Sequence, residues 1–218
     1  MIDNGARVIL AVAAEAGDDF IWDRLKLIQN DMFAAGPVDL KFAYFGREGA
    51  LATRPCITTH WVSDPDDLAE LMDKARAQCV CGCYINVSDI FAAALKETEQ
   101  APVQAVIVLG DAFHDNLDQA TARAKQLRAA GSRLFLFQQG QSASTERIFR
   151  TLADQTGGAY FQFNPAVERV AEKLPGLLEA VTHFAIGGTR ALEAQNNDSA
   201  ALLLNQINRR LDHRTASE

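Results

Sequence analysis

The 218-residue sequence predicts a single α/β domain: a mostly parallel central sheet with one antiparallel edge strand and helices on both faces. Short apolar runs bounded by turn residues alternate with segments whose apolar residues recur at helical spacing, which is typical of repeated strand-helix units. The run 104–109 is almost wholly aliphatic, as expected for a strand that helices cover on both sides. Hydrophobic residues make up 48% of the chain, enough for one well-buried core.

The boundaries of the expected elements follow from turn and cap residues. A short turn joins 39–45 to 50–57, so these two strands are expected to be antiparallel, because parallel neighbours need a crossover of about a dozen residues. Pro175 predicts an irregularity in the long helix that begins near 167. The expected strands cover 7–13, 39–45, 50–57, 104–109, 133–137 and 160–163, and the expected helices cover about 19–35, 65–75, 87–99, 117–130, 144–155, 167–181 and 200–211.

Charge and hydropathy argue against several classes of function. A formal net charge of −7 and a pI near 5.1 disfavour nonspecific binding of nucleic acid or anionic lipid, because both need clustered lysine and arginine. The apolar run near the N-terminus lacks the basic segment and cleavage site of a signal peptide. No stretch approaches the about 20 apolar residues that span a membrane. We therefore expect a cytoplasmic protein that binds neither nucleic acid nor membrane.

Four cysteines, Cys56, Cys79, Cys81 and Cys83, are expected to be reduced, because cysteines one residue apart rarely form a disulfide and no export signal is evident. Thiolates can bind Zn²⁺ or Cu(I), with His60 as a further ligand. The one-residue gaps differ from the two-residue gap usual in zinc sites. This spacing favours small, partly buried thiols over a metal site.

Several local phrases, taken in their order along the chain, resemble the von Willebrand factor type A (VWA) domain, in particular its small bacterial members. They are residues 7–12, Trp22-Asp23-Arg24, His60-Trp61-Val62-Ser63-Asp64, residues 107–111, residues 134–138 with Gly140, and Thr156-Gly157-Gly158-Ala159-Tyr160. The resemblance covers residues 5–188 and implies a Rossmann-like three-layer sandwich. It divides the chain into a VWA-like domain over 1–188 and a C-terminal helical tail over 189–218.

Members of this family typically hold Mg²⁺ or Mn²⁺ in a metal-ion-dependent adhesion site. Its oxygen ligands come from an Asp-x-Ser-x-Ser motif after the first strand, a threonine in a later loop and an aspartate after the fourth strand. In this chain Ala13 stands at the position of the motif's aspartate, and Glu15 and Gly17 stand at the positions of its two serines. The position of the threonine is near Ile85, so Asp111 is the one ligand that the chain retains. One carboxylate is a poor cage for Mg²⁺, which requires near-octahedral oxygen geometry. We therefore expect a degenerate site without metal.

The resemblance, with this loss of ligands, implies a non-enzymatic protein-interaction module that needs no cofactor and whose partner is a protein. Open α/β sheets generally bind their ligands outside the carboxyl ends of the strands. The expected partner-binding rim consists of Glu15, Gly17, Cys83, Tyr84 and Asp111.

One alternative is divalent-metal-dependent binding of a protein or other ligand. Glu15, Asp19 and Asp111 would form an acidic cluster for Mg²⁺ or Mn²⁺ at the carboxyl ends of the strands. Asp18 and Asp19 are explained equally well as caps of the first helix, because acids there accept hydrogen bonds from unpaired amides and favour the helix dipole.

A second alternative is a hydrolase or redox enzyme that uses Asp111, His114 and a cysteine. His114 and Asp115 could form an acid/base pair, but Asp115 also fits the N-cap of the helix that starts near Leu117. In the tail, an apolar stripe of Leu202, Leu203, Ile207 and Leu211 indicates a helix that packs on the domain or binds a partner.

Overall fold

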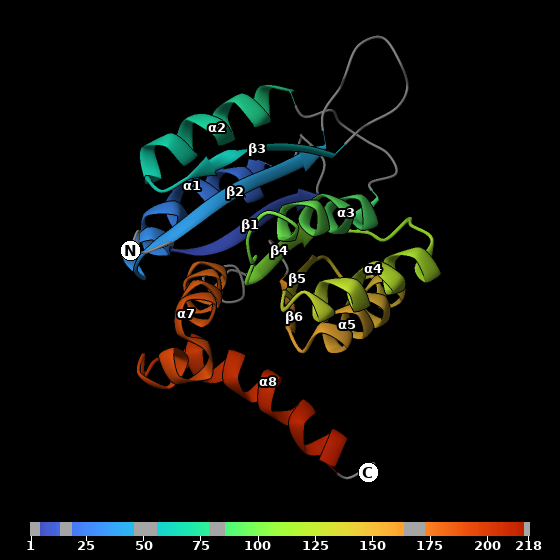
Figure 1. The fold of residues 1–218 in the computed structure, drawn as a ribbon. Helices are drawn as coiled ribbons and strands as arrows, with labels where there is room; N and C mark the ends of the chain where they lie inside the picture. Colours follow the sequence, from blue (N-terminus) through green and yellow to red (C-terminus); the bar gives the residue numbers. More distant parts are fainter. Residues whose placement is uncertain (1–4, 14–18, 46–55, 79–85, 164–172, 216–218) are drawn as a thin grey trace.

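The protein folds around a six-stranded mixed sheet with the strand order β3-β2-β1-β4-β5-β6 (Figure 1). The computed structural model describes residues 5–13, 19–45, 56–78, 86–163 and 173–215. All neighbouring strands are parallel except β2 and β3, which confirms the predicted antiparallel edge strand. The strands are β1 (Ala6–Ala13), β2 (Val38–Phe45), β3 (Cys56–Val62), β4 (Ala105–Gly110), β5 (Arg133–Gln139) and β6 (Ala159–Phe163).

Helices cover both faces of the sheet, which gives the predicted three layers. Residues from α1, α2, α7 and α8 share one hydrophobic cluster, and residues from α3, α4 and α5 share the other. None of the helices in the described ranges is long and apolar enough to cross a membrane. The helices are α1 (Asp19–Ala34), α2 (Pro65–Gln78), α3 (Val87–Thr98), α4 (Leu117–Ala129), α5 (Ala143–Thr156), α7 (Lys173–Glu193) and α8 (Asp198–Thr215).

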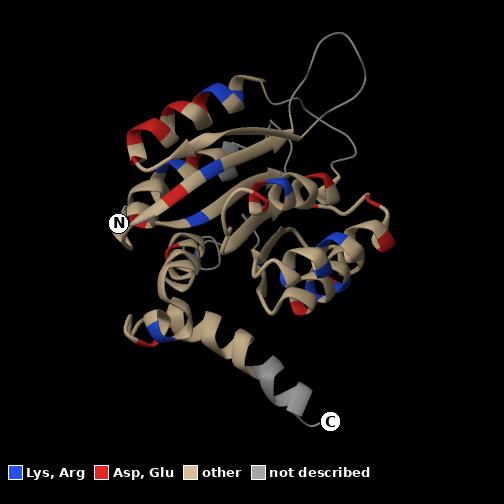
Figure 2. Ribbon diagram, viewed as in Figure 1, with Lys and Arg blue, Asp and Glu red and all other residues tan. Residues whose placement is uncertain are grey.

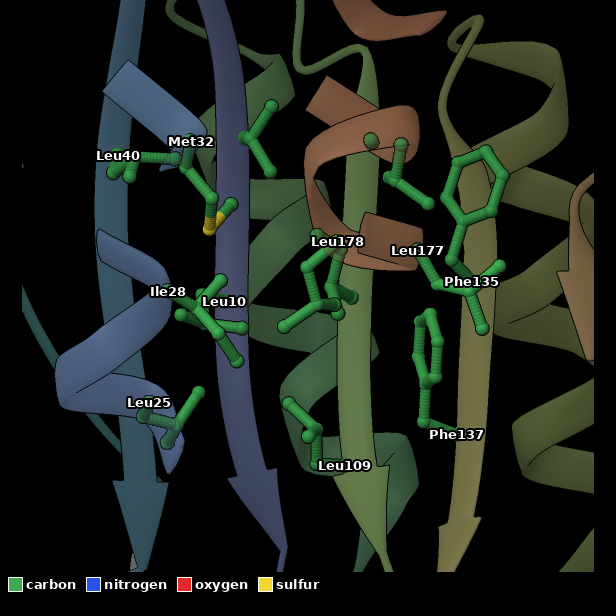
Figure 3. Packing of buried hydrophobic residues seen from close by; sticks show 14 of the residues in the cluster. Leu10, Leu25, Ile28, Met32, Leu40, Leu109, Phe135, Phe137, Leu177 and Leu178 are labelled. Carbon is green, nitrogen blue, oxygen red and sulfur yellow. The ribbon is translucent and has the colours of Figure 1, made fainter. Parts of the chain in front are cut away.

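On the face of the sheet that α1 and α7 cover, the core consists of every second residue of the strands and the apolar side of each helix. Figure 3 shows Leu10 of β1 and Leu109 of β4 beside Ile28 of α1 and Leu178 of α7. Every residue of β4 is buried, as the aliphatic run predicts, because helices pack against both of its faces. The core therefore fixes the central strands, whose carboxyl ends form the edge described below.

The third strand differs from its predicted position. It was expected over 50–57, but its described part begins at Cys56 and continues to Val62. Trp61 pairs with Lys41 and Ile57 pairs with Tyr44, with an irregularity between Lys41 and Ala43. Aromatic and β-branched residues fit a pleated surface, and these later residues supply them. Residues 50–55 lie outside the described part of the chain.

The structure describes the long helix, α7, only from Lys173, so the expected start near 167 and an irregularity between that start and Pro175 lie outside the described residues. Within the described residues, Pro175 lies in the first turn of α7, where a proline costs no helical hydrogen bond. The backbone instead leaves helical geometry at Gly187 (φ −138°, ψ 15°) and Gly188 (φ 64°, ψ −154°). The positive φ of Gly188 belongs to a region that glycine enters without steric cost.

The C-terminal helix α8 packs against α7 and β6. Leu203 and Ile207 of its apolar stripe are buried in the core, whereas Leu202 remains 39% exposed. The side chain of Leu211 lies outside the described part. A turn in which Asn196 has a φ of 48° connects the two helices.

Candidate interaction site at the carboxyl edge of the sheet

Asp111 lies at the carboxyl edge of the central strands. The register places Ala13 at the end of β1 opposite Gly110 of β4, and Gly110 opposite Gln138 of β5. Asp111 follows Gly110 directly and is exposed. Its carboxylate therefore stands where open α/β sheets place their ligands.

The loop after Asp111 is fixed to α3 by Asp115. The Asp115 carboxylate accepts hydrogen bonds from the backbone amide of Ser88 and, at 2.8 Å, from its hydroxyl. Arg123 of α4 donates to the Ser88 carbonyl at 2.6 Å and contacts Asp89 at 3.3 Å. The first turn of α3 and the loop after β4 thus form one rigid part of the edge.

The prediction that Asp115 caps α4 is wrong. Asn116 is the N-cap of that helix, and its side chain accepts a hydrogen bond from the Gln119 amide at 3.0 Å. Asp and Asn are both good N-cap residues, so the sequence alone does not decide between Asp115 and Asn116. In the structure Asp115 instead bonds the first turn of α3, which is distant in sequence. Both oxygens of Asp115 accept hydrogen bonds from Ser88, so Asp115 holds the first turn of α3.

Gln138 organises the neighbouring part of the edge and was not predicted as a site residue. Its side chain is fully buried at the carboxyl end of β5. The amide group donates to the Ser142 carbonyl at 2.9 Å, and Oε1 accepts from the Tyr160 hydroxyl at 2.7 Å. Burial raises the pKa of Tyr160 to about 12, with a further increase from Glu146. The glutamine pair Gln138-Gln139, directly after the run Leu-Phe-Leu-Phe, was the local signal for this role.

Of the predicted rim, the structure places Asp111 alone. Glu15, Gly17, Cys83 and Tyr84 lie outside the described residues, as do Asp18, Cys79 and Cys81. Asp19 is the first residue of α1, but its side chain is not described. The convergence of the rim and of the acidic cluster stays a prediction.

The described side chains form no metal centre. Within residues 5–13, 19–45, 56–78, 86–163 and 173–215, no group of three or more His, Cys, Asp or Glu residues is arranged to hold a metal ion. At the carboxyl edge, the Asp115 carboxylate is occupied by Ser88. The described donors Asp111 and Asp115 therefore do not fit a Mg²⁺ cage, which needs several converging oxygens.

Cys56 is the described member of the cysteine set. It is a free thiol, and burial together with the nearby charge of Asp89 raises its pKa to about 12. A thiol with so high a pKa is a weak nucleophile and a weak metal ligand at neutral pH, because the thiolate is the reactive form.

A charged cluster, the Glu97 cluster, holds the other end of α3. Glu97 forms ion pairs with Arg7 of β1 at 3.0 Å and Lys41 of β2 at 2.7 Å, and it accepts from Trp61 Nε1 at 2.9 Å. The Arg7 guanidinium also stacks on the Trp61 ring, 4.0 Å from its centroid. In Figure 2 these cations interrupt the otherwise mostly uncharged strands β1 and β2.

The balance of charge in the Glu97 cluster stabilises the ionised carboxylate. Partial burial by itself raises the pKa of Glu97, but hydrogen bonds from Lys41 and Trp61 and the charges of Lys41 and Arg7 outweigh it and hold the pKa below its usual value. Since α3 is fixed at Glu97 and at Ser88, the helix positions the edge loop that it contacts.

The sequence matches no protein-family model and no curated protein. Solved structures with similar folds include an aerotolerance-related membrane protein from Bacteroides fragilis with multiple mutations to serine (TM-score 0.54, 14% identity, covering 78% of this chain and 100% of that chain). The SpRpn10 VWA domain superposes with a TM-score of 0.56 and 12% identity, over 77% of this chain and 92% of that domain.

A von Willebrand factor type A protein from Catenulispora acidiphila superposes with a TM-score of 0.57 and 11% identity, over 84% of this chain. The chain has a VWA-like fold. The matched region spans 43% of the Catenulispora chain, and at this identity the likeness concerns the fold alone.

Proposed function

We propose that this chain is a non-enzymatic, cytoplasmic protein-interaction module that binds its partner at the carboxyl edge without a divalent metal. The exposed carboxylate of Asp111 at the end of the buried strand β4 is the observation that supports this proposal. Glu15, Gly17, Cys83 and Tyr84 complete the proposed rim. The neighbouring loops are held by Asp115 and Gln138, which gives the rim a rigid base.

The metal-free part of the proposal follows from the donors available. Where VWA domains with a metal have their first aspartate, this chain has Ala13, which lies in register with Gly110. The described carboxylate nearest to Asp111 in sequence, that of Asp115, accepts a hydrogen bond from the Ser88 hydroxyl. Recognition therefore rests on hydrogen bonds and shape, and Asp111 offers an acceptor to amide or cationic groups of a partner.

Photocrosslinking tests this proposal. A benzophenone amino acid at position 111 in the full chain is expected to form one defined adduct with a protein from the native lysate, in buffer that contains EDTA. The control position is Asp67, which is exposed in the first turn of α2. An adduct that forms equally at both positions, or only when Mn²⁺ is added, would contradict the proposal.

A further inference from the structure

A cavity of about 230 Å³ lies between α8, the start of α7 and the strands β5 and β6. In Figure 3 Leu177 of α7 lies beside Phe137 of β5, and both residues line this cavity. Protein interiors are otherwise close-packed, so an apolar space of this size is a candidate site for a small molecule. The described apolar residues that line it are Phe137, Phe161, Phe163, Leu174, Leu177 and Leu202.

The floor of the cavity is buried and aromatic. Phe137 and Leu174 are 0% and 1% exposed, and Phe163 and Leu177 are also buried. The rings of Phe137 and Phe161 stack with their centroids 5.3 Å apart. Aromatic rings pair favourably when they stack with an offset or meet edge to face. The floor therefore suits a ligand that has an aromatic body.

The mouth of the cavity carries a positive charge. Gln162, Lys173 and Leu202 line the cavity and are exposed, so they mark its opening to solvent. Lys173 is the only charged residue among the described residues of the lining. The amide of Gln206 is bonded to the Tyr160 backbone, accepting at 3.1 Å and donating at 2.6 Å. The Lys173 ammonium group is therefore the one placed to pair with an anionic group of a ligand.

The volume of the cavity limits the size of the ligand. An apolar cavity of about 150 Å³ holds one benzene molecule. Sites for drug-sized ligands have volumes of about 300 Å³ or more. The cavity lies between these two sizes, so it fits one aromatic ring with a short chain that reaches the mouth.

We propose that this cavity binds a small aromatic carboxylate, with its ring among the phenylalanines of the floor and its carboxylate at Lys173. The ring would be removed from water by Phe137, Phe161 and Phe163, while the charge would stay at the exposed mouth. The cavity contains none of the proposed rim residues, so this proposal does not rest on the proposed function.

Methyl NMR of the full chain with labelled leucine tests the proposal, with phenylpropionate as the probe. We expect saturable shifts of the Leu174, Leu177 and Leu202 methyl signals, with a dissociation constant of roughly 1 mM or lower. The methyl signals of Leu127, which is fully buried on the opposite face of the sheet, should not move. The absence of a saturable shift overturns the proposal, as do shifts that spread equally to Leu127.

Lys173→Met tests the role of the charge, because methionine keeps an apolar side chain of similar length. Phenylpropionate should bind this variant about fivefold more weakly, as expected for a partly exposed ion pair. The neutral analogue phenylpropanol should bind the variant and the unmodified protein equally. The matched control is Lys125→Met, which removes an exposed charge on α4 and should change neither affinity. Equal affinity of phenylpropionate for Lys173→Met and the unmodified protein overturns the proposal.

Discussion

Replacing Glu97 with glutamine tests whether the Glu97 cluster holds α3 to the sheet. The change removes the only carboxylate that the described contacts place between Arg7 and Lys41. The side chains of these cations are 12% and 9% exposed, so water cannot fully replace the lost charge. We therefore expect a large loss of stability from a substitution that preserves shape.

The expected size follows from the burial of the cluster. Removing one partner of a buried ion pair lowers the free energy of unfolding by about 3–5 kcal/mol, because the remaining buried charge is left uncompensated. We expect the lower end, about 3 kcal/mol, since glutamine still accepts a hydrogen bond from Trp61. With a urea m value of about 3 kcal/mol/M for a chain of this size, the unfolding midpoint should fall by about 1 M.

Urea unfolding followed by circular dichroism measures this shift. The matched control is Glu70→Gln, which breaks the exposed pair of Glu70 with Lys74 on α2, whose side chains are 66% and 62% exposed. Exposed pairs contribute little, so this control should leave the midpoint nearly unchanged. If Glu97→Gln shifts the midpoint no more than Glu70→Gln does, the reasoning about the cluster is refuted.

The same carboxylate gives a pH dependence of defined sign. The pKa of Glu97 is lower in the folded protein than its usual value of 4.5, so the unfolded chain binds the proton more tightly. The stabilisation is complete above the usual pKa and is lost as the pH falls from there through the lower folded-state pKa. Glu97→Gln should lack this part of the acid destabilisation. An identical acid slope in both proteins would contradict the assignment.

Three further changes test other parts of the site. Asp115→Ala should lower the free energy of unfolding by about 1–2 kcal/mol and speed hydrogen exchange at the Ser88 amide, because the first turn of α3 loses its carboxylate acceptor. Unchanged exchange at Ser88 would contradict this role of Asp115. Tyr160→Phe should lower the free energy of unfolding by about 1–3 kcal/mol, because the buried Gln138 Oε1 loses its hydrogen-bond donor. A double-mutant cycle with Gln138→Met that shows no coupling energy would contradict this hydrogen bond. With a pKa of about 12, Cys56 should react with iodoacetamide only as the chain unfolds, since roughly one thiol in ten thousand is ionised at pH 8. Fast alkylation of Cys56 in the folded protein would show a lower pKa.

Elements with a strong local pattern were predicted well from sequence. β4 is aliphatic throughout and buried on both faces, and the antiparallel pairing of β2 with β3 agrees with the edge strand expected from sequence. The bounds of β3 were missed because Trp61 and Val62 were assigned to the segment before α2. The effect of Pro175 depends on whether it falls in the first turn or in the interior of a helix, and the structure describes this helix only from Lys173.

The interactions that shape the site depend on contacts far apart in the chain. Glu97 lies 90 positions from Arg7, and Gln206 lies 46 positions from Tyr160, so neither pair has a local pattern. Asp115 and Asn116 are adjacent and chemically similar, and only the packing of α3 against the loop decides which helix each one caps. Asp111 was predictable because it directly follows a recognisable strand.

The central claim is that the carboxyl edge binds a protein without a divalent metal. The most direct measurement is the yield of the position-111 photocrosslinked adduct in EDTA compared with excess Mn²⁺ or Mg²⁺, alongside thermal unfolding of the free protein in the same buffers. We predict equal adduct yields and no change in melting temperature. A metal bound at a hundred times its Kd would stabilise the fold by about 2.7 kcal/mol. Such a shift, together with an adduct that EDTA abolishes, would contradict the claim.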